Sequence, residues 1–243
     1  MTRYDAIVGL LNSRSSQGSR RYEAAAERVA ADARAGGPLQ QYMLAVLAGN
    51  AALPPAAQID EETRQRYLEG TRGKIRQLAE TRGNALALYL LSMETNDIGL
   101  LKRAADGGNP QALNAYGTYL VDRAMAAAPS GTNDVASLLR EGFERFRLAA
   151  EKDDANGLYN LGLCRLHAWG CSRDEKLAFD SLRRAAALGH PDAMEDLAAC
   201  YEKGVGTPAS ATASIRWGMK ARAERGDRAA AEWLASNPLP EDD

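Results

Sequence analysis

The chain has 243 residues, a formal net charge of −2 and an isoelectric point of about 5.8, and 45% of its residues are hydrophobic but only 6% aromatic. This charge balance argues against a nucleic-acid-binding protein, which usually presents a basic face or an isoelectric point above about 9. The sequence contains no stretch of about 18 apolar residues, so no membrane-spanning helix is predicted. Alanine and leucine supply most of the apolar content, whereas valine and isoleucine are sparse, so the composition favours an all-α fold.

The N-terminal segment does not have the pattern of a signal peptide. Asp5 interrupts its apolar stretch, and no small-residue cleavage site follows. Three cysteines, an odd number without a paired pattern, do not indicate a disulfide framework. The chain as written is therefore predicted to be cytoplasmic, with a periplasmic or secreted location as the alternative if a leader has been removed.

A pattern of apolar or small residues at positions i, i+3, i+4 and i+7 recurs along the chain. This spacing places the residues on one face of a helix, and it predicts the first helix of each of several successive units. In chain order the copies begin at Tyr4, Gln41, Leu88, Leu113, Leu158, Met194 and Ala231. The third position is small in Ala45, Gly117, Gly162 and Ala198. Because glycine inside a helix costs about 1 kcal/mol, its presence there predicts a close crossing of two helices.

Turn residues separate the units, since glycine commonly follows a helix and proline commonly begins the next one. The turns fall at Gly36–Pro38, Gly83–Asn84, Gly107–Pro110, Asp153–Asp154, Gly189–Pro191 and Gly226–Asp227. Their spacing is 36 and 37 residues in the last two units, whereas Asn50–Ile59 and Ala126–Asp134 look like insertions in earlier ones. A period in this range is typical of a stacked helical solenoid. We expect about six helical hairpins and a C-terminal capping helix.

Several motifs in the C-terminal part resemble the Sel-one-like repeat (SLR) family of the tetratricopeptide-like superfamily. They are Asn160–Leu161–Gly162, Ala168–Trp169–Gly170–Cys171, Ala185–Ala186 and Gly204–Val205–Gly206. The Gly-x-Gly-Val turn of the family is intact once, since Ala168 and Cys171 depart from it. The resemblance covers residues 100–236 of a single domain, 1–243. Residues 1–99 resemble degenerate tetratricopeptide-like hairpins, and 237–243 form an acidic tail. The resemblance implies right-handed stacking of helical hairpins, a concave groove lined by first helices, and an adaptor or scaffold role, often in bacteria.

Candidate binding residues follow the first buried position of each first helix, where the resemblance implies that side chains face the groove. The column comprises Tyr42, Tyr89, Asn114, Tyr159 and Glu195, and Asn160 lies beside it. Tyrosine offers apolar area and a hydroxyl at low entropic cost, and asparagine can both donate to and accept from an extended peptide. The alternative is that the tyrosines cover the seam between repeats.

No set of residues predicts catalysis, a cofactor or a metal. The spacing of Cys164, His167, Cys171 and Cys200 matches none of the usual zinc pairs, so the cysteines are interpreted as core residues. The sequence predicts a non-enzymatic module that binds a segment of another protein, with no nucleic acid and no membrane span. One alternative is an envelope-associated protein that stacks its tyrosines on a glycan or peptidoglycan fragment. Another is an enzyme with an unusual site in the Ala126–Asp134 insertion. The oligomeric state is not predicted.

Overall fold

A computed structural model describes residues 20–50, 53–81, 83–128 and 134–237. These residues form twelve α-helices and one short 3-10 helix, with no strand among them, which confirms the predicted all-α fold. The elements are α2 (Arg20–Arg34), α3 (Pro38–Asn50), η2 (Pro55–Ala57), α4 (Glu61–Thr81), α5 (Ala85–Thr95), α6 (Ile98–Asp106), α7 (Pro110–Ala127), α8 (Val135–Ala150), α9 (Ala155–His167), α10 (Glu175–Ala187), α11 (Pro191–Lys203), α12 (Ala211–Glu224) and α13 (Arg228–Ser236). None of the described helices is both long and apolar enough to cross a membrane.

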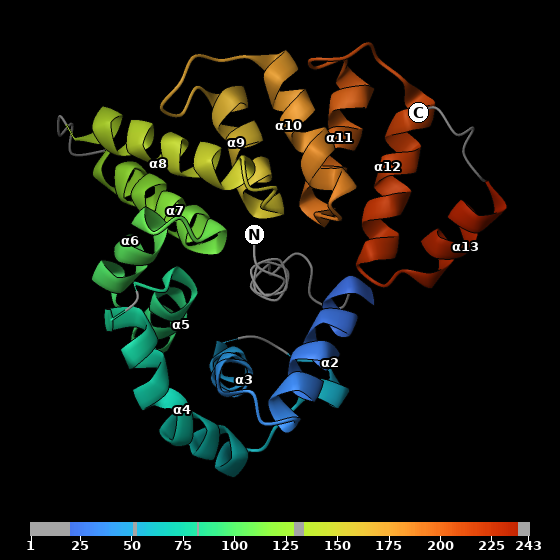
Figure 1. The fold of residues 1–243 in the computed structure, drawn as a ribbon. Coiled ribbons are helices and arrows are strands. Elements are labelled where there is room, and N and C mark those ends of the chain that lie inside the picture. Colours follow the sequence, from blue (N-terminus) through green and yellow to red (C-terminus); the bar gives the residue numbers. More distant parts are fainter. Residues whose placement is uncertain (1–19, 51–52, 82, 129–133, 238–243) are drawn as a thin grey trace.

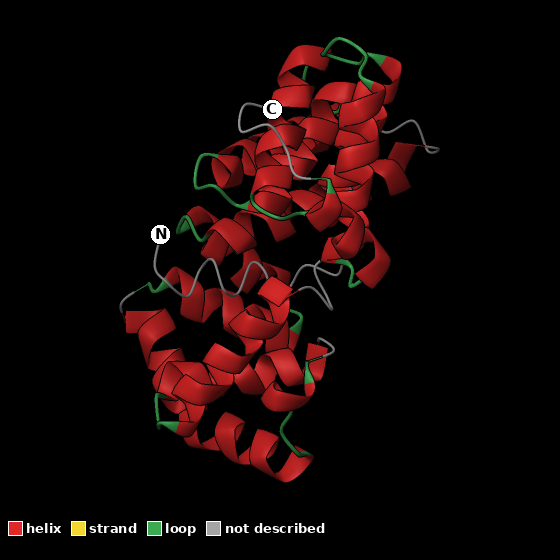
Figure 2. Ribbon diagram, turned by 90° about the vertical axis from the view of Figure 1, so that its right-hand side faces the viewer, coloured by secondary structure: helices red, strands yellow, loops and turns green. Residues whose placement is uncertain are grey.

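Consecutive helices pack as hairpins, and each hairpin packs against the next along the chain. The complete hairpins of the described residues are α3–α4, α5–α6, α7–α8, α9–α10 and α11–α12, and α13 packs on α12. Helix α2 precedes hairpin α3–α4 and occupies the position of the second helix of the first predicted hairpin. The first helix predicted from Tyr4 lies outside the described residues, as do parts of both insertions and most of the acidic tail. In Figure 1, α3, α5 and α7 follow the inner side of a curve and α4, α6 and α8 its outer side. Figure 2 shows the molecule elongated in the perpendicular view, so the curve winds as a superhelix.

The predicted turns lie between the hairpins, and a polar residue at or near the end of five of these turns caps the helix that follows. Side chains of the N-terminal capping residues accept a hydrogen bond from the backbone N–H three residues later, at 2.8–3.2 Å. The capping residues are Asn84, Asn109, Asp154, His190 and Asp227. Because the first N–H groups of a helix have no partner within it, these side chains fix where each first helix begins.

Small residues allow the two helices of a hairpin to approach closely, as the sequence predicts. A Cβ atom added at Gly117 would lie 2.8 Å from the Phe146 ring and 3.2 Å from the carbonyl oxygen of Gly142 on α8. One added at Gly162 would lie 3.0 Å from the Leu182 side chain on α10. The two carbon–carbon distances, 2.8 and 3.0 Å, are shorter than an ordinary contact of about 3.5–4.0 Å, so the crossings require glycine or a local rearrangement.

The loop within each of the last two complete hairpins rests on the second helix of the preceding hairpin. Gly170 has a φ of 74°, and an added Cβ would overlap the backbone carbonyl of Leu139 on α8. Gly206 has a φ of 68°, and an added Cβ would overlap the carbonyl of Glu175 and approach Phe179 on α10. The glycines of the family-like loop motif therefore serve the stacking of one repeat on another.

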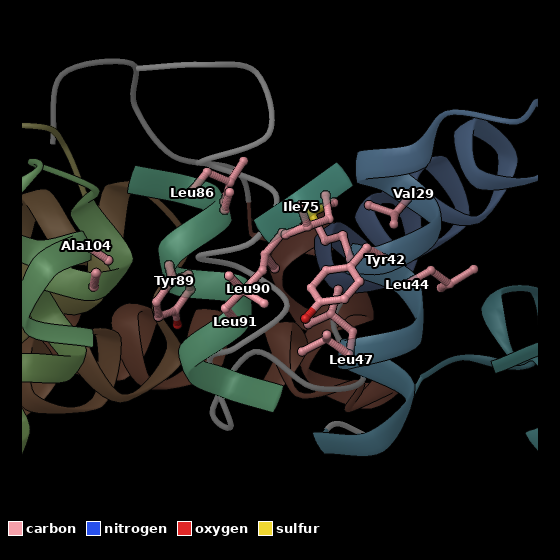
Figure 3. Close-up of a cluster of buried hydrophobic side chains, with 14 of the residues drawn as sticks. Val29, Tyr42, Leu44, Leu47, Ile75, Leu86, Tyr89, Leu90, Leu91 and Ala104 are labelled. Carbon is pink, nitrogen blue, oxygen red and sulfur yellow. The ribbon is translucent and has the colours of Figure 1, made fainter. Parts of the chain in front are cut away.

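Two clusters of buried apolar side chains form the core. One runs from Tyr22 to Ala149, and the other from Val121 to Ala221, so they meet at hairpin α7–α8. Figure 3 shows part of the first cluster, in which leucines of α3 and α5 surround Tyr42. The division of the chain at residue 99 stays a prediction from sequence motifs.

Candidate functional site

The first two tyrosines of the predicted column lie in the seam between repeats. Tyr42 is 0% exposed and Tyr89 is 5% exposed, and Figure 3 shows both rings among leucine side chains. The Tyr42 hydroxyl donates to the carboxylate of Glu94 on α5, which also pairs with Arg72 on α4. Burial and the neighbouring Glu94 raise the pKa of Tyr42. In this conformation Tyr42 joins three helices and offers no surface to a partner.

The middle of the column brings polar side chains of successive repeats together. The Asn160 amide on α9 donates from Nδ2 to Oδ1 of Asn114 on α7 at 2.8 Å. Tyr159 is half-buried, and burial together with the neighbouring Asp196 carboxylate on α11 raises the pKa of its hydroxyl. We call Asn114, Tyr159, Asn160 and Asp196 the inner strip. It extends over the first helices of three hairpins.

Asp196 is a residue of the inner strip that the sequence analysis missed. It lies 36 residues after Asn160, so it occupies the same position in the next repeat. Burial, followed by the nearby charges of Asp192 and Glu195, raises the pKa of Asp196, whereas the Tyr159 hydroxyl lowers it. The repeat register was the signal that could have identified this residue.

Glu195, the last residue of the predicted column, is exposed and forms an ion pair with Arg225. The same guanidinium binds the carboxylate of Asp192 at 2.5 Å. One arginine therefore faces two carboxylates, and with Asp196 nearby the α11 end of the inner strip carries net negative charge.

Buried polar residues hold α7, α9 and α11 in register beneath the strip. Gln111 donates to the Asp154 carboxylate at 3.4 Å, and Asn109 donates to the Gln111 side-chain oxygen at 3.2 Å. Burial raises the pKa of Asp154 to about 6, although three hydrogen bonds oppose the shift. The His190 ring stacks on the Tyr159 ring with centroids 4.5 Å apart, and burial lowers the pKa of His190 to about 4.

Asp154 and His190 are expected to give opposite pH dependences of stability. Folding favours the neutral form of both, so His190 loses stability as pH falls from about 6.5 to 4, whereas Asp154 gains it from about 6 to 3.8. His190→Asn should match the wild type at pH 7.5 and gain a relative advantage on acidification. Asp154→Asn should be the more stable protein at neutral pH and lose that advantage. The pKa shifts correspond to at most about 3 kcal/mol for Asp154 and about 3.5 kcal/mol for His190.

Urea unfolding at several pH values between 7.5 and 4 checks this expectation. Asparagine keeps the N-terminal cap in both variants. Subtracting the wild-type free energy of unfolding at each pH removes the contribution of all other titrating groups. Parallel pH trends in the two variants would contradict the assignment.

The structure places the cysteines in or beside the core. Cys164 and Cys200 are buried, and the Cys171 thiol donates to the Cys164 carbonyl oxygen at 3.5 Å. Burial raises the pKa of all three thiols, which disfavours the reactive thiolate. Within the described ranges no three His, Cys, Asp or Glu side chains are grouped so that they could hold a metal ion.

Comparison with known proteins gives no matching family model. A solved Sel1 repeat protein from Oxalobacter formigenes is similar at 23% identity and a TM-score of 0.46, over 53% of this chain and 91% of that one. A protective antigen of uropathogenic Escherichia coli strains, which displays an SLR fold, is similar at 18% identity and a TM-score of 0.42. That similarity covers 91% of this chain and 54% of the antigen. Both proteins are of the repeat type that residues 100–236 resemble in sequence.

Proposed function

We propose that this helical repeat protein is a non-enzymatic interaction module that binds a segment of another protein along the inner side of its curve. The observation that carries the proposal is the inner strip. Successive first helices bring the amides of Asn114 and Asn160 and the Tyr159–Asp196 pair together. An enzyme would need a nucleophile, an acid–base pair or a metal set, and the strip offers groups suited to binding.

The strip is suited to an extended peptide. An asparagine amide offers both donor and acceptor atoms, so Asn114 and Asn160 can bind a peptide backbone after giving up their mutual hydrogen bond. The half-buried Tyr159 ring adds apolar area. Negative charge at the α11 end favours a segment that carries a basic residue there.

The buried tyrosines move the expected contact toward the C-terminal half of the chain. Tyr42 and Tyr89 lie in the core, so removing their rings would test stability rather than binding. The glycan alternative relied on stacking by the rings of Tyr42, Tyr89 and Tyr159. Of these three rings, the first two are buried and Tyr159 is partly exposed. The asparagine pair therefore favours a peptide over a sugar as the ligand.

Selection from a phage-displayed library of random peptides tests the proposal. Enriched peptides should bind the wild type and lose at least about tenfold in affinity, or about 1.4 kcal/mol, with Asn114→Ala/Asn160→Ala. The matched control is Glu144→Ala/Arg147→Ala, which removes an exposed ion pair on α8, on the outer side of the curve. Circular dichroism is used to check that both variants are folded.

Two outcomes would contradict the proposal. Peptides that bind the Asn114→Ala/Asn160→Ala protein as tightly as the wild type would place binding elsewhere. Selective binding to a glycan array, with no enriched peptide, would favour the sugar alternative.

A further inference from the structure

The end of the described solenoid has an open crevice between α12 and α13. The space measures about 720 Å³, and its apolar wall includes Met194, Trp217, Ala231 and Leu234. Helix α10 buries six residues, from Ala178 to Ala186, whereas α12 buries Ala221 alone. The last complete hairpin is therefore much less covered than the one before it.

One cation of α12, Lys220, lies at this crevice, and a second, Arg216, lies one turn earlier on the same helix; neither has an anionic partner among the described residues. Lys220 lines it, with its ammonium 4.0 Å from the centre of the Trp217 ring. Burial and the nearby charge of Arg216, one turn earlier, lower the pKa of Lys220. Arg216 donates from Nη2 to the neutral carbonyl of Asn237 at 2.8 Å, and its Nε is buried without a hydrogen-bond partner. Neither residue takes part in any ion pair that the described part of the chain forms.

The other charged residues at the crevice either form ion pairs of their own or lie too far from Lys220 to pair with it. Asp227 binds Arg222 at 2.6 Å and caps α13, and Arg228 pairs with Glu232. Glu224 lies one turn beyond Lys220, yet the two make no ion pair within 4 Å.

The preceding repeat has an ion pair at the position equivalent to Lys220. Arg184 lies 36 residues before Lys220, and its guanidinium binds the carboxylate of Asp153 at 2.7 Å. The residue 36 positions after Asp153 is Gly189, which keeps the same left-handed conformation, with a φ of 89° against 53°. The last repeat therefore keeps the cation and the turn but lacks the carboxylate.

We propose that the α12–α13 crevice binds an acidic, partly apolar segment of a partner protein. A carboxylate of that segment takes the place of Asp153 and binds Lys220, and an adjacent apolar side chain packs on Trp217 and Leu234. Charge complementarity selects this occupant, because a partly buried ammonium on an apolar wall, with a second cation one turn away, is stabilised by a carboxylate. The site is separate from the inner strip and is expected to work independently of it.

Two end-blocked peptides, alternating leucine with glutamate or leucine with glutamine, test this site by titration calorimetry on the whole chain. The glutamate peptide should bind at least about tenfold tighter, and more weakly as salt is added. Lys220→Met keeps the apolar stem and should abolish the preference. Lys203→Met, at an exposed position on α11, should keep it, and so should Asn114→Ala/Asn160→Ala.

Stability of the free protein provides a second readout. Because an unpaired, partly buried ammonium costs free energy, Lys220→Met should melt at or above the wild-type temperature. A lower melting temperature would show that Lys220 is paired in the free protein. That result would overturn the proposal, as would equal affinity for the two peptides, no measurable binding, or an unchanged preference in Lys220→Met.

Discussion

Replacing Gly206 by alanine should lower the free energy of unfolding by about 2–6 kcal/mol. This range is the sum of a backbone strain of about 1–3 kcal/mol and overpacking of similar size. The backbone φ of 68° is one that residues with a side chain rarely adopt. In addition, the new methyl group would overlap the backbone carbonyl of Glu175 on the preceding hairpin. A backbone atom inside a helix cannot rotate away, so the loop must lift from α10. Urea unfolding followed by circular dichroism measures the loss.

Two other glycines of the same hairpin separate the causes. Gly204 has a φ of 71°, but an added Cβ would meet its nearest neighbour at 3.5 Å, so Gly204→Ala should show the strain alone. Gly218 lies inside α12 with open space around it, and Gly218→Ala should stabilise the protein by about 0.5–1 kcal/mol. A Gly206→Ala loss no larger than that of Gly204→Ala would mean that the loop does not rest on α10.

Local sequence rules predicted the parts of the fold that depend on neighbouring residues. Turns, helix starts and small residues at hairpin crossings each have a signal within one repeat, and the turns between described helices and the crossings at Gly117 and Gly162 lie where the pattern put them. The loop glycines were recognised as a family motif. Their contact with the preceding repeat required the three-dimensional stacking, because Gly206 and Glu175 lie 31 residues apart.

The candidate site was harder to predict, because burial depends on partners that are distant in the chain. The Tyr42 hydroxyl is satisfied by Glu94, 52 residues away, and a buried tyrosine needs such a partner. Nothing in the spacing of the column distinguishes this buried tyrosine from the half-buried Tyr159. Likewise, the sequence register aligns Gly189 with Asp153, but the Arg184–Asp153 ion pair that gives this difference its meaning joins residues 31 positions apart and is seen in the structure.

Replacing Leu161 by alanine should lower the free energy of unfolding by about 2–5 kcal/mol, a large part of the roughly 5–15 kcal/mol that stabilises a typical protein. Leu161 is 5% exposed and belongs to the second core cluster, which runs from α7 to α12. Truncation leaves a cavity in that cluster, and the packed helices around it can close the cavity only in part.

The matched control is another leucine of the same hairpin. Leu177 on α10 is 46% exposed, so Leu177→Ala should change stability by at most about 0.5 kcal/mol. Because each hairpin is stabilised by its neighbours, the Leu161→Ala loss should shift the urea midpoint of the whole chain and leave the slope unchanged. A changed slope or a second transition would instead show that the repeats around α9 unfold separately, and equal losses for the two leucines would mean that Leu161 does not occupy the buried position of its repeat.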